Sequence, residues 1–135
     1  MEAEAPIFVA GHRGMVGSAV CRRLAESTCE VLTASRDQLD LCSAEATNDY
    51  FAAEQPDTVI FAAAKVGGIV ANNTYPVEFL SDNALMAIHA VNAAFRSGAK
   101  RFLFLGSTCI YPRDCQQPIV EQALLTGPLE QTNEA

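Results

Sequence analysis

The sequence predicts an α/β fold built on a parallel sheet, and three observations carry this prediction. Short apolar segments alternate along the chain with segments of helical periodicity, which is typical of parallel sheets with right-handed crossovers. The segments at 58–64 and 101–105 are continuously apolar, as in strands that are buried on both faces. Three glycines spaced three residues apart follow the first apolar segment directly. We therefore expect a strand–turn–helix unit at the start and helices on both faces of the sheet.

The expected elements follow from apolar spacing and from turn residues. Ser43 is a suitable N-cap for one helix, and Pro76 is a suitable first residue of another. The helix that begins at Pro76 is apolar on two sides, as in a helix packed between two layers. We expect the strands in the order 3-2-1-4, with a ligand crevice between the first and the fourth. The expected strands are 7–10, 29–33, 58–64 and 101–105, and the expected helices are 15–26, 43–54 and 76–95.

Composition narrows the class of protein. The 135 residues, half of them apolar, suit one domain, and we expect a single domain over 1–135 without a second one. A net charge of −7 and the lack of long Lys/Arg runs argue against sequence-independent nucleic-acid binding. The five cysteines show no C-x-x-C spacing, which favours reduced thiols and no metal site. The N-terminus does not resemble a secretory signal, and no apolar stretch is long enough to span a membrane. These features predict a cytoplasmic protein without nucleic-acid or membrane partners.

The glycine segment 11–17 predicts a dinucleotide site. Its spacing is G-x-x-G-x-x-G, placed between a strand and a helix, where backbone amides can bind a pyrophosphate. The first glycine allows the turn, the second leaves room for the phosphates, and the third lets the helix pack on the strand. The sheet is therefore expected to be of the Rossmann type. The expected cofactor-binding residues of this segment are Gly11, His12, Arg13, Gly14, Met15, Val16 and Gly17.

Two arginines indicate which dinucleotide is bound. Arg36 follows the second expected strand, where an acidic residue would favour NAD and an arginine favours the 2′-phosphate of NADP. Arg13 lies in the glycine segment, and two guanidinium groups near one phosphate form a clamp. Asp37 leaves NAD open, because its carboxylate could accept from a ribose 2′-hydroxyl. We expect NADP(H), with further contacts from Asp40 and Leu41 beside the adenine and from Ala62, Ala63 and Ala64 at the end of the third strand. The alternative for Asp40 is a turn residue without a ligand, and the alternative for the three alanines is ordinary packing within the sheet.

The candidate chemistry follows the fourth strand. Leu105, Gly106, Ser107 and Thr108 would lie beside the nicotinamide, and Cys109 comes next. Ser107 could donate a hydrogen bond to a substrate carbonyl, and the Cys109 thiol could exchange a proton beside it. The alternative is that these are turn residues and a small apolar side chain.

Three segments, 11–19, 62–76 and 104–112, closely resemble the GDP-L-fucose synthase family of extended short-chain dehydrogenase/reductases. The resemblance implies an NADPH-dependent epimerase–reductase that converts GDP-4-keto-6-deoxy-D-mannose to GDP-L-fucose. It implies that Ser107 and Cys109 are catalytic, at the carbonyl and in proton exchange respectively, and that Arg36, Asp40 and Leu41 bind the adenosine phosphate. It also implies a GDP-sugar substrate and a homodimer in which helix 76–95 forms part of the interface. Burial of the second apolar face of this helix against a further part of the same protein is the alternative.

The chain departs from that family at the Tyr-x-x-x-Lys pair. The residues four positions after Tyr50, Tyr75 and Tyr111 are Glu, Phe and Cys, and the 128–134 segment that precedes the catalytic tyrosine in the family is followed here by Ala135. The resemblance therefore predicts an N-terminal fragment, incomplete at its C-terminal side and inactive alone. Two alternatives are an inactive NADP-binding module and another sugar-nucleotide epimerase or dehydratase; the 65–68 loop argues against the latter.

Overall fold

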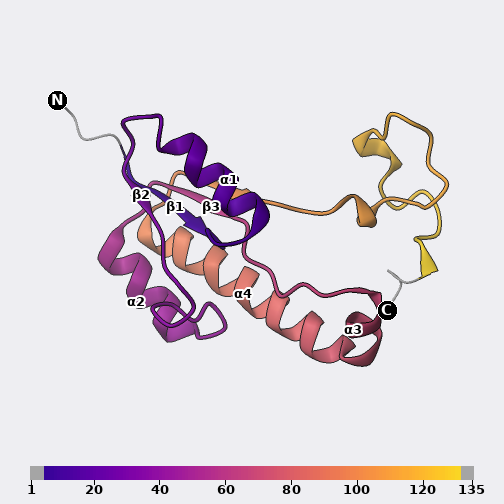
Figure 1. Cartoon of the computed structure of the whole chain (residues 1–135), viewed down its shortest axis with the longest axis horizontal. Helices are drawn as coiled ribbons and strands as arrows, with labels where there is room; N and C mark the ends of the chain where they lie inside the picture. The colour runs from indigo at the N-terminus through magenta and orange to yellow at the C-terminus, as the bar shows by residue number, and fades with distance from the viewer. Residues whose placement is uncertain (1–4, 132–135) are drawn as a thin grey trace. The chain divides into compact units, whose positions relative to one another are not determined.

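The computed structural model describes residues 5–131 (Figure 1). The chain forms two compact units, 5–66 with 78–105 and 67–77 with 106–131. No helix in the described part is long and apolar enough to cross a membrane. The elements in chain order are β1 (Ile7–Ala10), α1 (Met15–Leu24), β2 (Val31–Leu32), α2 (Ala44–Glu54), β3 (Thr58–Phe61), α3 (Ile69–Thr74), α4 (Pro76–Ser97), β4 (Arg101–Phe104) and the 3₁₀ helices η1 (Thr108–Ile110) and η2 (Glu121–Ala123).

The first unit contains a parallel sheet in the order β2-β1-β3-β4. The parallel α/β class is confirmed, but the expected order 3-2-1-4 is wrong. Strand β2 pairs with β1 over only two residues, and the chain after it forms turns, so β2 offers little edge for a further strand. Strand β3 instead pairs with β1 over four residues, from Ile7 opposite Thr58 to Ala10 opposite Phe61. The order therefore reverses between β1 and β3, and the ligand crevice is expected there.

Helices cover both faces of this sheet, as predicted (Figure 1). Successive strand residues point to opposite faces, so Phe8 packs into the cluster with α2 and α4 while the fully buried Val9 faces the side of α1. The predicted N-cap is also confirmed, because Ser43 accepts from the amide of Ala46 at 3.2 Å. The main core cluster consists of Phe8, Ala10, Leu39, Leu41, Phe51, Val59, Phe61, Ala90, Ala93 and Ala94.

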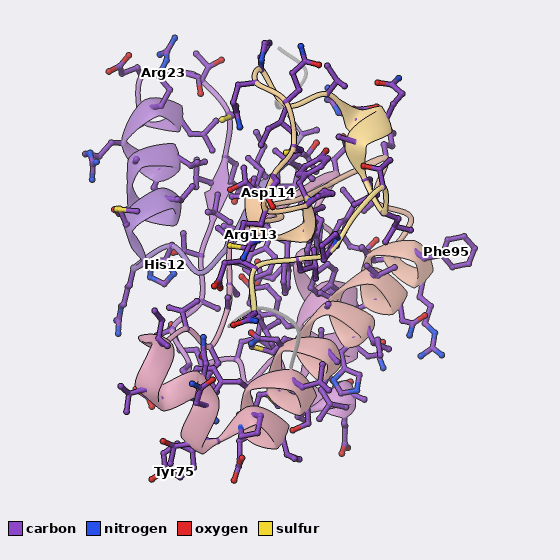
Figure 2. The ribbon with its side chains drawn as sticks, turned by 90° about the vertical axis from the view of Figure 1, so that its right-hand side faces the viewer. His12, Arg23, Tyr75, Phe95, Arg113 and Asp114 are labelled. Atoms are coloured by element: carbon purple, nitrogen blue, oxygen red, sulfur yellow. The ribbon has the colours of Figure 1, made fainter. Side chains whose placement is uncertain are left out.

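Helix α4 has two apolar faces, as its spacing predicts. Its alanines Ala90, Ala93 and Ala94 are buried in the core cluster. A second stripe of apolar side chains is exposed, and Phe95 projects away from the ribbon with 85% of its surface accessible (Figure 2). The exposed stripe comprises Leu80, Ile88, Val91 and Phe95.

The second unit is built from short elements and loops. It contains α3 and the two 3₁₀ helices. The amide of Arg113 donates to the carbonyl of Pro128 at 3.1 Å, and Gly127 lies against the ring of Pro112. These contacts join the two ends of its C-terminal segment.

Tyr50 gives the first unit a pH-dependent stability. Burial, reinforced by the Glu54 carboxylate, raises the pKa of Tyr50 to about 12. An unfolded tyrosine ionises near pH 10, so the native state keeps its proton when the unfolded state loses it, and stability falls as the pH rises from about 10 towards 12. We expect Tyr50→Phe, which keeps the ring contact 5.0 Å from Phe8, to remove part of this loss. Urea unfolding at pH 9 and at pH 11 measures this loss of unfolding free energy. Tyr75→Phe is the control: Tyr75 is 54% exposed, and this variant should lose as much stability as the wild type.

Candidate functional site

The turn between β1 and α1 has the geometry that its glycines predict. Gly11 has a φ of +81°, and a Cβ there would lie 2.6 Å from the carbonyl oxygen of Ala62. Gly14 is the N-cap of α1, and its amide donates to the carbonyl of Gly11 at 2.9 Å. A Cβ at the buried Gly17 would overlap the Gly11 carbonyl. The first and third glycines therefore allow β1, β3 and α1 to pack closely, and the helix N-terminus begins where the turn ends.

A cavity of about 350 Å³ opens beside this turn, entirely within the first unit. It lies at the carboxyl ends of β1 and β3, where the strand order reverses, and the segment after β2 closes one side. His12 marks its position at the end of the α1 ribbon (Figure 2). The lining residues are Gly11, His12, Arg13, Gly14, Ala34, Ser35, Arg36, Leu39, Asp40, Leu41, Cys42, Ala62, Ala63, Ala64, Lys65, Asp82 and Met86.

The cavity brings together most of the residues that the sequence singled out. Ten predicted cofactor residues from three separate segments line it: Gly11, His12, Arg13, Gly14, Arg36, Asp40, Leu41, Ala62, Ala63 and Ala64. Five others of the first unit are not among its lining: Met15, Val16, Gly17, Asp37 and Leu105. Gly106, Ser107, Thr108 and Cys109 belong to the second unit. The two arginines of the expected phosphate clamp therefore share one cavity, whereas Asp37 stands outside its wall.

The segment after β2 is held by its own side chains. The Gln38 side-chain oxygen accepts from both the amide and the hydroxyl of Ser35 at 2.9 Å, and the Asp40 carboxylate accepts from the amide of Cys42 at 3.0 Å. Leu41 is 9% exposed. Asp40 is thus a turn residue before a buried leucine, as one prediction had it, and it also lines the cavity.

Charges of both signs surround the cavity. The ammonium group of Lys65 forms an ion pair with Asp82 at 2.7 Å. Burial, together with Asp40 and Asp82, raises the pKa of the Cys42 thiol, and Arg36 partly offsets this rise. Cys42 is therefore held as a neutral thiol in the wall at physiological pH.

Sequence reasoning missed seven residues of this wall: Ala34, Ser35, Leu39, Cys42, Lys65, Asp82 and Met86. Lys65 directly follows the predicted alanines and could have been found by extending that segment by one residue. Asp82 and Met86 are four residues apart on α4, so they share one helix face. Periodicity marks such a face as inward but does not show what it contacts.

Ser107 and Cys109 form a local turn in the second unit. Ser107 precedes η1, and its hydroxyl accepts from the amide of Cys109 at 3.2 Å. The Cys109 side chain is exposed. The turn role that the sequence allowed for Ser107 is therefore present, and the catalytic roles of both residues stay predictions.

Comparison with known proteins adds the family. Residues 7–135 match the sequence model of the NAD dependent epimerase/dehydratase family. The chain belongs to this family. It is 55% identical over 128 residues to a GDP-L-fucose synthase of Sinorhizobium fredii and 50% identical over 129 residues to that of Escherichia coli, in each case over 95% of this chain. The chain spans 41% and 40% of the length of these two relatives.

Solved structures of similar proteins share the fold. The protein DdhaC superposes with a TM-score of 0.91 at 38% identity, over 98% of this chain and 39% of that one. A GDP-L-fucose synthetase from Naegleria fowleri, solved with NADP bound, superposes with a TM-score of 0.83 at 27% identity, over 98% of this chain and 40% of that one. These likenesses confirm the Rossmann-type fold that the glycine segment predicts.

Proposed function

We propose that the chain contributes the NADP-binding domain of a GDP-L-fucose synthase, an epimerase–reductase acting on GDP-4-keto-6-deoxy-D-mannose. One observation carries the proposal: a single cavity is lined by the glycine turn up to Gly14, the N-cap of α1, and by both arginines, Arg13 and Arg36. Its relatives at 50% and 55% identity bear the synthase name. NADP is bound in the related Naegleria fowleri structure.

The residues present fit this cofactor. Gly14 carries no side chain, so phosphate oxygens can approach the amides at the start of α1. Arg13 and Arg36 supply the positive charge that a 2′-phosphate requires. The apolar wall of Leu41 and the alanines at 62–64 suits an adenine ring. NADPH would supply the hydride that reduces the C4 ketone of the sugar.

Ser107 and Cys109 have proposed roles in the chemistry. The Ser107 hydroxyl would donate a hydrogen bond to the sugar carbonyl, and the Cys109 thiol would exchange protons at the neighbouring carbon. The exposed thiol of Cys109 supports this role, because a proton donor must be accessible to substrate. The GDP-sugar substrate and a cytoplasmic location belong to the same proposal, as does a homodimer that covers the exposed stripe of α4.

Calorimetric titration of the chain with NADPH and NADH tests the cofactor site. We expect NADPH to bind at least about tenfold more tightly, because charge-assisted hydrogen bonds to the 2′-phosphate are absent with NADH. Equal affinities would contradict the arginine clamp, and no binding of either would contradict the proposed function. Binding is the suitable readout, since no tyrosine among the 135 residues is followed by lysine at the fourth position.

A further inference from the structure

Helix α4 contacts two opposite sides of the cavity through polar side chains. One side is the segment 62–65 after β3, which we call the β3 rim; the other is the segment 39–42 after β2, which we call the β2 rim. Asp82 and Met86 of α4 line the cavity between them. The same stretch of α4 also carries Asn83 and His89, which do not line the cavity but bond to its rims. The proposed function uses neither residue.

Asn83 holds the β3 rim by its backbone. Its side-chain oxygen accepts from the amide of Lys65 at 2.8 Å, and its side-chain nitrogen donates to the carbonyl of Lys65 at 2.9 Å. The same nitrogen donates to the carbonyl of Phe79 at 2.7 Å, one turn earlier on α4. The amide group thus bonds both backbone groups of Lys65 at once, as a neighbouring strand would. An asparagine can do this because it carries a donor and an acceptor side by side.

The Lys65 side chain returns to the same helix. Its ammonium group pairs with Asp82 at 2.7 Å and lies 5.5 Å from the centre of the Phe79 ring. Backbone and side chain of this residue are therefore both attached to α4. The β3 rim cannot shift without breaking these contacts.

His89 holds the β2 rim. Its Nδ1 lies 3.1 Å from the carbonyl oxygen of Leu41, and because a carbonyl only accepts, Nδ1 donates. The neighbouring thiol of Cys42 donates to the carbonyl of Asp82 at 3.9 Å. Leu41 is buried and lies within the turn that the Asp40–Cys42 bond closes, so fixing its carbonyl fixes the apolar wall that it forms.

We propose that Asn83 and His89 are positioning residues that set the separation of the two rims for an adenosine 2′-phosphate group. The inference rests on the proposed function, since it assigns the cavity to a dinucleotide. A flat ring between two walls gains dispersion energy only at close contact, and a gap of about 0.5–1 Å forfeits a quarter to a half of it. One helix that bonds both walls keeps this separation constant, and neither residue needs to touch the ligand.

The test measures binding of NADPH and of adenosine 2′,5′-bisphosphate by calorimetry, at a temperature where circular dichroism shows each variant folded. Asn83→Leu and His89→Leu introduce no charge and replace each side chain by an apolar one, so they remove the hydrogen bonds to the rims. We expect each to weaken both ligands about tenfold, in line with the loss of one or two hydrogen bonds. His89→Asn retains a donor near the position of Nδ1 and should stay within about twofold of the wild type. Asn92→Leu is the matched control, because Asn92 is exposed on the same helix.

A purely structural role gives a different pattern. In that case the variants would melt at lower temperature but bind both ligands with wild-type affinity while folded, and this result overturns the inference. Amide exchange provides a second measurement: the amide of Lys65 should exchange faster in Asn83→Leu, while the amide of Ala94, in the buried part of α4, should not. A wild-type chain that binds neither ligand would overturn the proposed function together with this inference. Wild-type binding with unaffected variants would overturn the inference alone.

Discussion

The Gly11→Ala variant is expected to lose about 2–5 kcal/mol of unfolding free energy, from the left-handed backbone and from overpacking together. The φ of Gly11 is +81°, and an added Cβ would lie 2.6 Å from the Ala62 oxygen and 2.7 Å from the Ala63 nitrogen. Both are backbone atoms at the end of β3, and the Ala62 amide is bonded to the Ala10 carbonyl at 3.0 Å. The clash can be relieved only by separating β1 from β3. NADPH binding should be lost as well, because the cavity opens at this junction.

The Gly98→Ala variant separates the cost of backbone strain from the cost of steric overlap. Gly98 has nearly the same φ, +80°, but a Cβ there meets nothing within 4 Å. It should therefore lose only the strain contribution of about 1–2 kcal/mol. Urea denaturation of the two variants measures the difference. If Gly11→Ala were no less stable than Gly98→Ala, steric overlap between the turn after β1 and the end of β3 would not contribute to the loss of unfolding free energy.

The Arg36→Ala variant is expected to bind NADPH about 10- to 100-fold more weakly while its affinity for NADH changes little. A charge-assisted hydrogen bond contributes about 1.5–3 kcal/mol, and the 2′-phosphate that Arg36 would bind exists only in NADPH. Arg13→Ala should show the same selectivity, since both residues line the cavity. The double variant should bring the two cofactors to similar affinity.

Arg23→Ala is the matched control for loss of one positive charge. Arg23 lies at the far end of α1 from His12, is 78% exposed and pairs with Glu26 (Figure 2). Its removal should leave both titrations unchanged. An Arg36→Ala variant that loses NADPH and NADH equally would show a general electrostatic effect, and a wild type that prefers NADH would favour Asp37 as the ribose partner.

Local sequence patterns account for much of this fold. A strand of apolar residues before the glycines, a helix after them and the Ser43 cap are properties of adjacent residues, so spacing predicts them. The same holds for the exposed and buried stripes of α4, which follow from its 3.6-residue period. The residues at 11–14 and 62–64 that line the cavity were predicted because they follow β1 and β3 directly, and Arg36 because it lies in the segment after β2.

Strand order and the rest of the cavity wall depend on distant contacts. Whether β3 pairs with β1 or with β2 is decided by which edge is long enough to bond it, and the two-residue β2 emerges only in the folded sheet.

The sequence by itself thus predicted the α/β class, the glycine turn and the two arginines that line the cavity, because these depend on neighbouring residues. The tertiary structure alone decided that the crevice lies between β1 and β3 and that α4 forms its wall. The physical reason is that the contacts of α4 with the cavity wall join residues far apart in the sequence. Asn83 bonds Lys65, 18 positions away, and His89 bonds Leu41, 48 positions away. Pairings over such separations depend on how the sheet and helix pack, which no local spacing records.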